Sequence, residues 1–132
     1  MGLPRILLAD DHPDMLKKVA QLLKGDFEVV AAVENGERLI EAAINLDPDL
    51  IVLDISMPVL NGIEAARCLK ESGSQAKVIF LTMHEDPGFV TAAFSAGALG
   101  YVVKTRLVTD LIPAIREVLQ GHVFASPLAS IH

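Results

Sequence analysis

Five polar residues lie at the ends of short apolar runs: Asp10, Asp11, Asp54, Thr82 and Lys104. If folding brings the three carboxylates together, each pair repels by about 4 kcal/mol at about 4 Å and an effective dielectric of about 20. Hard oxygen ligands select Mg²⁺, which also binds phosphate oxygens. An aspartate can attack phosphorus to form an aspartyl phosphate. A metal, a lysine and a hydroxyl would stabilise the transferred group. This set predicts phosphoryl transfer to Asp54.

The apolar runs before these residues are predicted to be β-strands. Five such runs alternate with longer stretches at helical spacing, and they are Arg5–Asp10, Glu28–Val33, Leu50–Leu53, Lys77–Leu81 and Leu99–Val103. Strands that alternate with helices form a parallel sheet covered on both faces. We expect an α/β fold with a doubly wound, five-stranded parallel sheet in the flavodoxin-like order 2-1-3-4-5. A half-barrel is the alternative, because periodicity leaves the strand order open.

The stretches between the strands predict amphipathic helices that end at glycine or proline. These helices are expected around Met15–Leu23, Leu39–Ile44, Ile63–Leu69, Pro87–Ala96 and Thr109–Gln120, with Pro113 near the first turn of the last one. Parallel strands end on the same edge of a sheet, and ligands bind in the crevice beyond those ends. The three carboxylates, the hydroxyl and the ammonium are therefore expected to converge at that edge.

Composition narrows the class of protein. The chain has 132 residues, enough for one domain, and its 52% hydrophobic and 21% charged residues exclude intrinsic disorder. The net charge of −6 argues against nucleic-acid binding by this segment. A lone Cys68 excludes an internal disulfide and fits a reducing compartment. No apolar run reaches the ~18 residues of a membrane span, and the N-terminus has no signal-peptide pattern, so we expect a soluble cytoplasmic protein.

Four segments contain the candidate residues: Leu8–Pro13, Asp54–Gly62, Leu81–Thr82 and Gly97–Lys104. In their order and spacing, these segments resemble the receiver domain of response regulators in two-component signalling. The resemblance covers about residues 4–121. It implies that Asp54 accepts a phosphoryl group from a sensor histidine kinase or a small phosphodonor. It further implies that Asp11, Asp54 and the backbone carbonyl of Ser56 coordinate Mg²⁺, and that Asp10 supports the metal shell.

The same resemblance implies a switch. Thr82 would hydrogen-bond a phosphoryl oxygen, Lys104 would pair with it, and Tyr101 would move inward as Thr82 shifts. We expect the phosphorylated form to favour a displaced fourth helix, which carries few large apolar anchors, and an altered partner surface. The domain would act as a phosphoacceptor that assists only its own phosphorylation and dephosphorylation, and not as an enzyme.

Further segments resemble receivers of the NarL/LuxR type: Asp11–Pro13, Ser56–Pro58, Gly62–Ala65 and Gly121–Pro127. Members of that type usually continue into a helix-turn-helix domain that binds DNA. We therefore expect a receiver domain at residues 1–121, with residues 122–132 as a tail or the start of a linker. DNA contact and transcription control would run through an output domain absent from this chain, which is either an excised receiver or one that acts alone. A homodimer is a further expectation, and membrane binding is not expected.

The residue after Lys104 departs from the family pattern. Many receivers have a proline there, often after a cis bond, whereas this chain has Thr105. A cis bond before a residue other than proline costs about 2.5–4 kcal/mol, so we predict a trans peptide. His12 and His84 lie near the acidic edge, where they are either functional or simply solvated. We hypothesise that Ser56 and His84 tune the lifetime of the phosphorylated form. His122 and His132 are interpreted as tail residues.

Each residue taken singly has another interpretation. Asp11 could cap the following helix, in competition with Asp14, Thr82 could be an ordinary strand-end residue, and Lys104 could be a solvated charge. Tyr101 could be a partly buried tyrosine without a switch role.

Two alternatives remain for the function as a whole. One is a receiver fold that serves as a scaffold without phosphorylation. The other is a phosphatase of the haloacid dehalogenase type, which expects an acid where this chain has Ser56.

Overall fold

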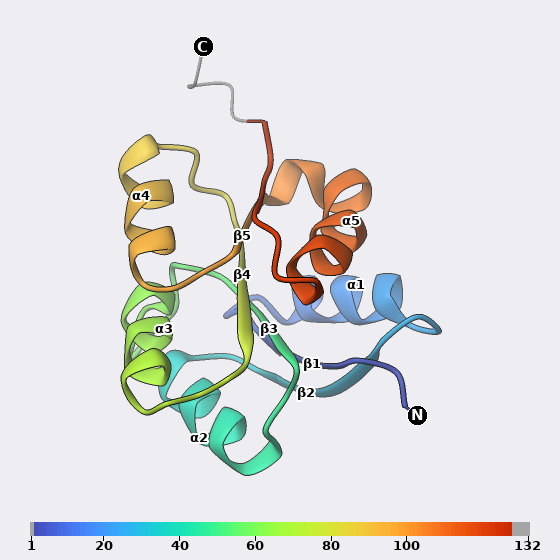
Figure 1. Ribbon diagram of the computed structural model, residues 1–132, viewed down its shortest axis with the longest axis horizontal. Coiled ribbons are helices and arrows are strands. Elements are labelled where there is room, and N and C mark those ends of the chain that lie inside the picture. The colour runs from blue at the N-terminus through green and yellow to red at the C-terminus, as the bar shows by residue number, and fades with distance from the viewer. Residues whose placement is uncertain (1, 128–132) are drawn as a thin grey trace.

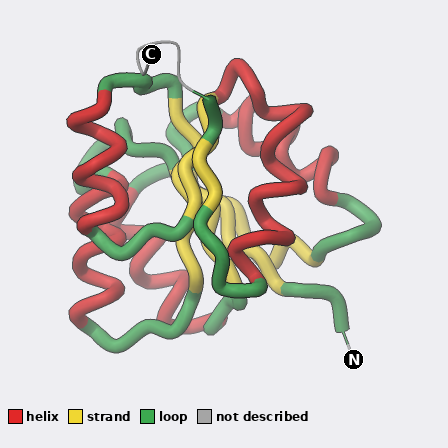
Figure 2. Tube along the Cα trace, turned by 45° about the horizontal axis from the view of Figure 1, so that its top comes forward, coloured by secondary structure: helices red, strands yellow, loops and turns green. Residues whose placement is uncertain are grey.

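Within residues 2–127, which the computed structural model describes, six parallel strands form one sheet with helices on both faces (Figure 1 and Figure 2). The strands are β1 Arg5–Ala9, β2 Glu28–Val33, β3 Leu50–Leu53, β4 Lys77–Thr82, β5 Gly100–Val103 and β6 Phe124–Ala125. The helices are α1 Pro13–Leu23, α2 Gly36–Leu46, α3 Gly62–Glu71, α4 Pro87–Ser95 and α5 Leu107–Leu119, and a short 3₁₀ turn, η1, spans Lys104–Arg106.

The strands lie in the order β2-β1-β3-β4-β5-β6. The predicted doubly wound parallel sheet is confirmed, and the first five strands follow the expected order. The predicted number of strands was wrong, because Phe124 and Ala125 pair with Gly100 and Tyr101 of β5. Two residues are too few to show a hydrophobic period, so the sequence pattern missed this strand. The expected domain boundary at residue 121 stays a prediction, and residues 128–132, including His132, lie outside the described residues.

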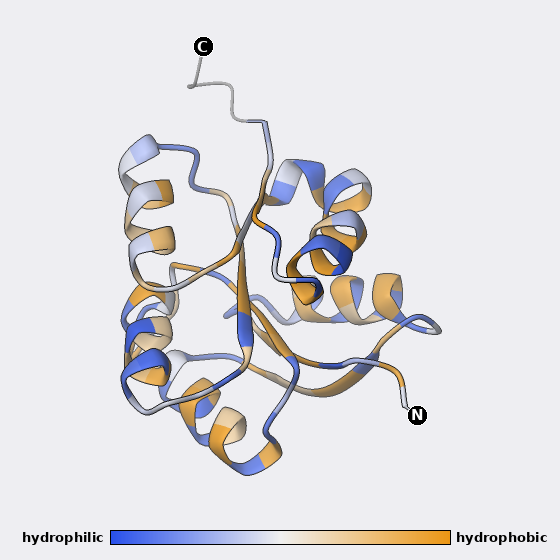
Figure 3. Cartoon of the chain, viewed as in Figure 1, coloured by the Kyte–Doolittle hydropathy of each residue, from blue (hydrophilic) through white to orange (hydrophobic). Residues whose placement is uncertain are grey.

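The core consists of two apolar layers, one on each face of the sheet. Successive strand residues point to opposite faces, so Ile6 and Leu8 pack with α1 and α5, whereas Leu7 and Ala9 pack with α2, α3 and α4. All four residues of β3 are at most 3% exposed. A strand buried on both faces shows a continuous apolar run. Figure 3 shows hydrophobic residues along the central strands and hydrophilic ones in the surrounding loops.

The segment after β5 differs in detail from its prediction. Helix α5 begins at Leu107, which is buried in the layer shared with α1, and packing therefore extends the helix beyond the expected start at Thr109. Pro113 consequently lies inside the helix and not near its first turn. The predicted trans peptide between Lys104 and Thr105 is confirmed, since no cis peptide occurs among the described residues. None of the helices described is both long and apolar enough to cross a bilayer.

The loop between β3 and α3 packs tightly against the end of β3. Asn61 caps α3 by accepting a hydrogen bond from Glu64 N at 2.9 Å, and Gly62 N donates to the Ile55 carbonyl at 2.8 Å. A Cβ atom on Gly62 would lie 2.0 Å from the carbonyl oxygen of Asp54. Only glycine therefore lets α3 begin this close to Asp54.

We predict that Gly62→Ala lowers the free energy of unfolding by about 1–3 kcal/mol, because the added methyl group must displace the backbone of Asp54. Gly88→Ala in α4 is the matched control, since a Cβ there meets nothing within 4 Å. Alanine's higher helix propensity should make that control more stable by up to about 1 kcal/mol. Urea unfolding followed by circular dichroism measures both variants, and equal effects would contradict the steric explanation.

Candidate functional site

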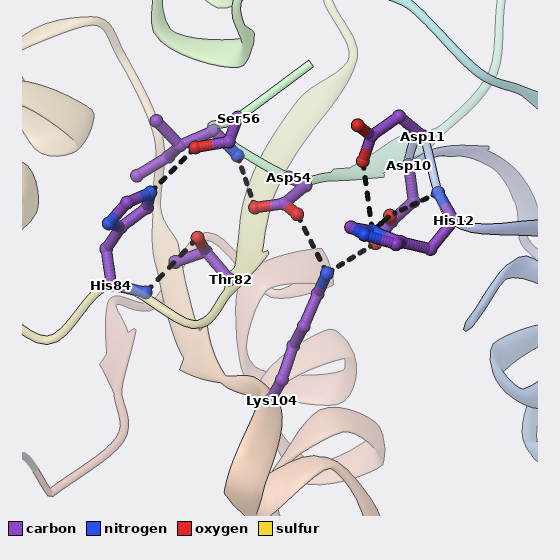
Figure 4. A network of polar contacts seen from close by, with 9 residues as sticks. Asp10, Asp11, His12, Asp54, Ser56, Thr82, His84 and Lys104 are labelled. Atoms are coloured by element: carbon purple, nitrogen blue, oxygen red, sulfur yellow. Dashed lines mark hydrogen bonds and ion pairs between the residues drawn. The ribbon is translucent and has the colours of Figure 1, made fainter.

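The five polar residues predicted from the sequence surround one site at the carboxyl edge of the sheet (Figure 4). Asp10 and Asp11 follow β1, and Asp54 follows β3. Thr82 is the last residue of β4, and Lys104 opens η1 directly after β5. Their convergence follows from the parallel sheet, because neighbouring strands deliver their next residues to the same edge.

Lys104 joins two of the carboxylates. Its Nζ lies 2.8 Å from Asp54 Oδ2 and 2.8 Å from Asp10 Oδ2, and the three side chains are only 5–6% exposed. Burial alone would lower the pKa of the Lys104 ammonium, but the hydrogen bonds to Asp10 and Asp54 outweigh burial and raise the pKa above its ordinary value. The lysine is therefore charged, and it offsets part of the repulsion between the two acids. The alternative of a solvated Lys104 is wrong.

The remaining contacts of Asp54 and its neighbours fix the carboxylates in place. Asp54 Oδ1 accepts a hydrogen bond from Ile55 N at 2.7 Å. Asp10 Oδ1 accepts one from His12 N at 3.0 Å and lies 3.1 Å from His12 Nδ1. Both oxygens of Asp54 thus have a donor, and Asp10 has the His12 backbone on one oxygen and Lys104 on the other.

One oxygen of the acidic cluster lacks a hydrogen-bond partner. Asp11 Oδ1 is buried and makes no hydrogen bond, although it lies 3.0 Å from His12 Nδ1. Asp10, Asp11, His12 and Asp54 each offer a ligand atom, and these atoms all lie within 4.8 Å of one another. A buried carboxylate oxygen without a donor is costly, and a bound cation would satisfy it. The residues present therefore form a group that could hold a metal ion.

His84 connects the loop after β4 to the loop after β3. Its Nε2 lies 2.8 Å from Ser56 Oγ, and its ring stacks on Phe89 with centroids 4.2 Å apart. Its backbone N–H donates to Thr82 Oγ1 at 3.4 Å. Ser56 and His84 were expected to tune the lifetime of the phosphorylated form together, but their direct contact, which joins two loops at residues 28 positions apart, was not predicted.

Tyr101 is fully buried in this structure. Its hydroxyl donates to the His84 carbonyl oxygen at 2.8 Å. Burial raises the pKa of Tyr101 to about 12, with further contributions from the negative charges of Asp54, Asp86 and Glu85. Its exposed fraction is 0%, so Tyr101 is fully and not partly buried, and its role in a switch stays a prediction.

We predict that Tyr101 ionises with a pKa of about 12, above its ordinary value of 10.0. The chain has one tyrosine and no tryptophan, so the rise of phenolate absorbance with pH reports this residue alone. Because the folded pKa is raised, the contribution of neutral Tyr101 to stability is complete below pH 10 and is lost as pH rises through about 12. Circular dichroism should show the fold intact before the phenolate appears. Tyr101→Phe is the control, and ionisation near 10 in the folded protein would contradict this prediction.

Known proteins resemble this chain in sequence and in fold. The family model described as the response regulator receiver domain matches residues 6–116. The transcriptional regulatory protein DegU of Brevibacillus brevis is 38% identical over 93% of this chain and 53% of its own length. The nitrate/nitrite response regulator protein NarL of Escherichia coli strain K12 is 37% identical over 92% of this chain and 57% of its own length. The chain thus spans just over half the length of these relatives.

The fold resembles a solved structure over almost the whole of both chains. The two-component response regulator of the LuxR family from Aurantimonas sp. SI85-9A1 superposes with a TM-score of 0.90 and is 33% identical, covering 96% of this chain and 91% of that one. The sequence motifs, the sheet order and these similarities agree. The chain belongs to the response regulator receiver domain family, and its relatives are of the NarL/LuxR type.

Proposed function

We propose that this chain accepts a phosphoryl group on Asp54 in a Mg²⁺-dependent reaction and thereby switches a partner surface. The observation that carries the proposal is the ion pair between Lys104 and Asp54, with Asp10 as the second partner of the same ammonium. A buried lysine beside an aspartate at a strand end, with further carboxylates next to it, suits a transferred group of high negative charge.

Asp54 is the acceptor in this proposal. A carboxylate oxygen of Asp54 forms a bond to phosphorus as the bond from phosphorus to the donor breaks. The donor is a phosphohistidine of a sensor kinase, whose imidazole leaves, or acetyl phosphate, whose acetate leaves. Lys104 then exchanges its bond to the carboxylate for one to a phosphoryl oxygen. Its raised pKa keeps it positively charged throughout.

Asp11 and Asp54 would hold Mg²⁺ together with the backbone carbonyl of Ser56, and Asp10 would support the metal. The unpartnered Asp11 Oδ1 and the close carboxylates support this set. When bound, Mg²⁺ would neutralise charge on the acids and on the phosphoryl oxygens. His12 orients Asp10, since its backbone N–H donates a hydrogen bond to Asp10 Oδ1.

Thr82 and Tyr101 would carry the signal away from Asp54. The Thr82 hydroxyl accepts a long bond from His84 N at 3.4 Å, and its own hydrogen is available to a phosphoryl oxygen. A shift of Thr82 would move the His84 backbone, whose carbonyl holds the Tyr101 hydroxyl. Helix α4 is a suitable moving element, because Ala93 is its one buried residue. A coupling of this kind is typically worth about 1–3 kcal/mol.

The output would lie outside this chain. We propose that the domain works with a sensor histidine kinase in the cytoplasm, forms homodimers, and controls transcription through a helix-turn-helix domain. The relatives named above support this role, and their names describe transcriptional and response regulators. The chain acts here as a signalling phosphoacceptor that assists only its own phosphorylation and dephosphorylation.

We predict that incubation with acetyl phosphate and Mg²⁺ adds one phosphoryl group, measured by intact mass, because Asp54 is the nucleophile. Asp54→Asn should abolish the gain, as should removal of Mg²⁺ with a chelator. Asp14→Asn, at an exposed aspartate of α1, is the matched control and should behave as wild type. No gain in the wild type with Mg²⁺ bound would favour a scaffold, and turnover of a phosphate ester would favour a phosphatase.

We predict that replacing both Ser56 and His84 with alanine shortens the half-life of the phosphorylated form several-fold. Their contact lies beside Asp54 (Figure 4), with Phe89 stacked on His84, and there it would limit the approach of water. Radiolabel loss or mass spectrometry measures the decay. His122→Ala, at an exposed histidine bonded to Glu117, is the control. An unchanged half-life would refute the hypothesis, and a longer one would instead assign His84 the role of a base.

A further inference from the structure

A further buried carboxylate, that of Asp110, lies outside the acidic cluster in the first turn of α5, and the residue is 6% exposed. Ser126 Oγ donates to Asp110 Oδ2 at 2.6 Å, and Arg106 Nε donates to the same oxygen at 2.8 Å. Arg106 Nη2 and Thr109 Oγ1 donate to Oδ1 at 3.3 and 3.1 Å. Burial would raise the pKa of Asp110, but these hydrogen bonds outweigh it and lower the pKa. Asp110 is therefore ionised, with a donor on each oxygen.

Ser126 connects Asp110 to β5. Its backbone N–H donates to the Tyr101 carbonyl at 2.8 Å, which continues the pairing of β6 with β5. Its side chain then accepts a hydrogen bond from Val103 N at 3.3 Å, in the place where a longer strand would offer a carbonyl. Ser126 is 3% exposed. One hydroxyl thus accepts from Val103 and donates to Asp110.

These contacts secure both flanks of the turn that carries Lys104. Val103 precedes Lys104 and is held through Ser126, whereas Arg106 lies two residues after it and is held by Asp110 directly. The residue after Lys104 is Thr105, so no proline ring fixes the backbone φ angle at that position. The Lys104 ammonium lies 2.8 Å from two carboxylates at once, so a displacement of its backbone must strain the side chain or lengthen one of the two bonds.

We propose that Asp110 and Ser126 are positioning residues, which hold the η1 turn so that Lys104 Nζ reaches both Asp54 and Asp10. Neither residue touches the acidic cluster, and both act through the backbone and through Arg106. The expected effect of these two residues on phosphorylation rests on the proposed function. Their expected effect on the position of the Lys104 ammonium is independent of phosphorylation.

The test compares Ser126→Ala with Ser126→Thr, which keeps the hydroxyl. In nitrogen-correlated NMR spectra of the lysine ammonium groups, Lys104 should give a protected signal that is absent in Lys104→Ala. Ser126→Ala should broaden or remove that signal, and Ser126→Thr should keep it. Ser72→Ala, which removes a hydroxyl bonded to the Leu69 carbonyl away from the site, is the matched control.

The kinetic arm measures Mg²⁺-dependent phosphorylation by acetyl phosphate. Ser126→Ala should slow it by roughly tenfold to a hundredfold, the range expected when a reacting group is misplaced by about 1 Å. In a Lys104→Ala background the same change should add no further slowing. Ser126→Thr and Ser72→Ala should stay close to wild type. If Ser126→Ala fails to fold, Arg106→Ala removes the ion pair with Asp110 instead, at a side chain that is 43% exposed. Arg106→Ala should also slow phosphorylation.

Two results would overturn the proposal. One is a Lys104 signal unchanged in both Ser126→Ala and Arg106→Ala. The other is equal slowing by Ser126→Ala with and without Lys104, which would mean a general loss of structure. If wild-type protein is not phosphorylated at all, the proposed function fails, and the NMR arm still decides whether Ser126 positions Lys104.

Discussion

The site depends on one buried ammonium held between two buried carboxylates. Moving charges out of water is costly, and the attraction between Lys104 and its partners offsets that cost only when the geometry is good. Removing one member of such a pair typically costs about 3–5 kcal/mol, because it leaves an unpaired charge inside the protein. The strands that deliver Asp10, Asp54 and Lys104 must therefore keep their order and register. The parallel sheet supplies that register, since β1 pairs with β3, and β4 lies between β3 and β5.

His84 links the chemistry at Asp54 to the rest of the domain. Its backbone N–H reaches Thr82, its carbonyl holds Tyr101, and its ring contacts Ser56 and Phe89. Strands β4 and β5, the loop after β3 and helix α4 therefore all contact this single residue. A displacement of Thr82 would move His84 through the chain and through their hydrogen bond, and His84 would in turn move Tyr101 of β5. A displacement of α4 would reach His84 through Phe89.

The sequence predicted the fold and the polar residues of the site because both follow from local patterns. The bounds of Glu28–Val33 and Leu50–Leu53 agree with the structure, since the apolar runs end sharply at polar residues. Asp54 could be placed because its strand is buried on both faces. Strand β6 and the contacts of Ser126 and Asp110 were missed, because they depend on pairing between distant segments. Likewise, no local pattern shows that the hydroxyl of Ser56 would reach the ring of His84.

Strand β6 has a mechanical consequence. Because β6 runs parallel to β5, tension on the backbone at Pro127 acts along the direction of β5 and loads the Ser126 contacts together in shear. These contacts attach to the Tyr101 carbonyl, the Val103 amide and Asp110, so the load falls on the strand that carries Tyr101 and leads into Lys104. Force applied at Pro127 would therefore act on the strand that leads directly into the buried ion pair.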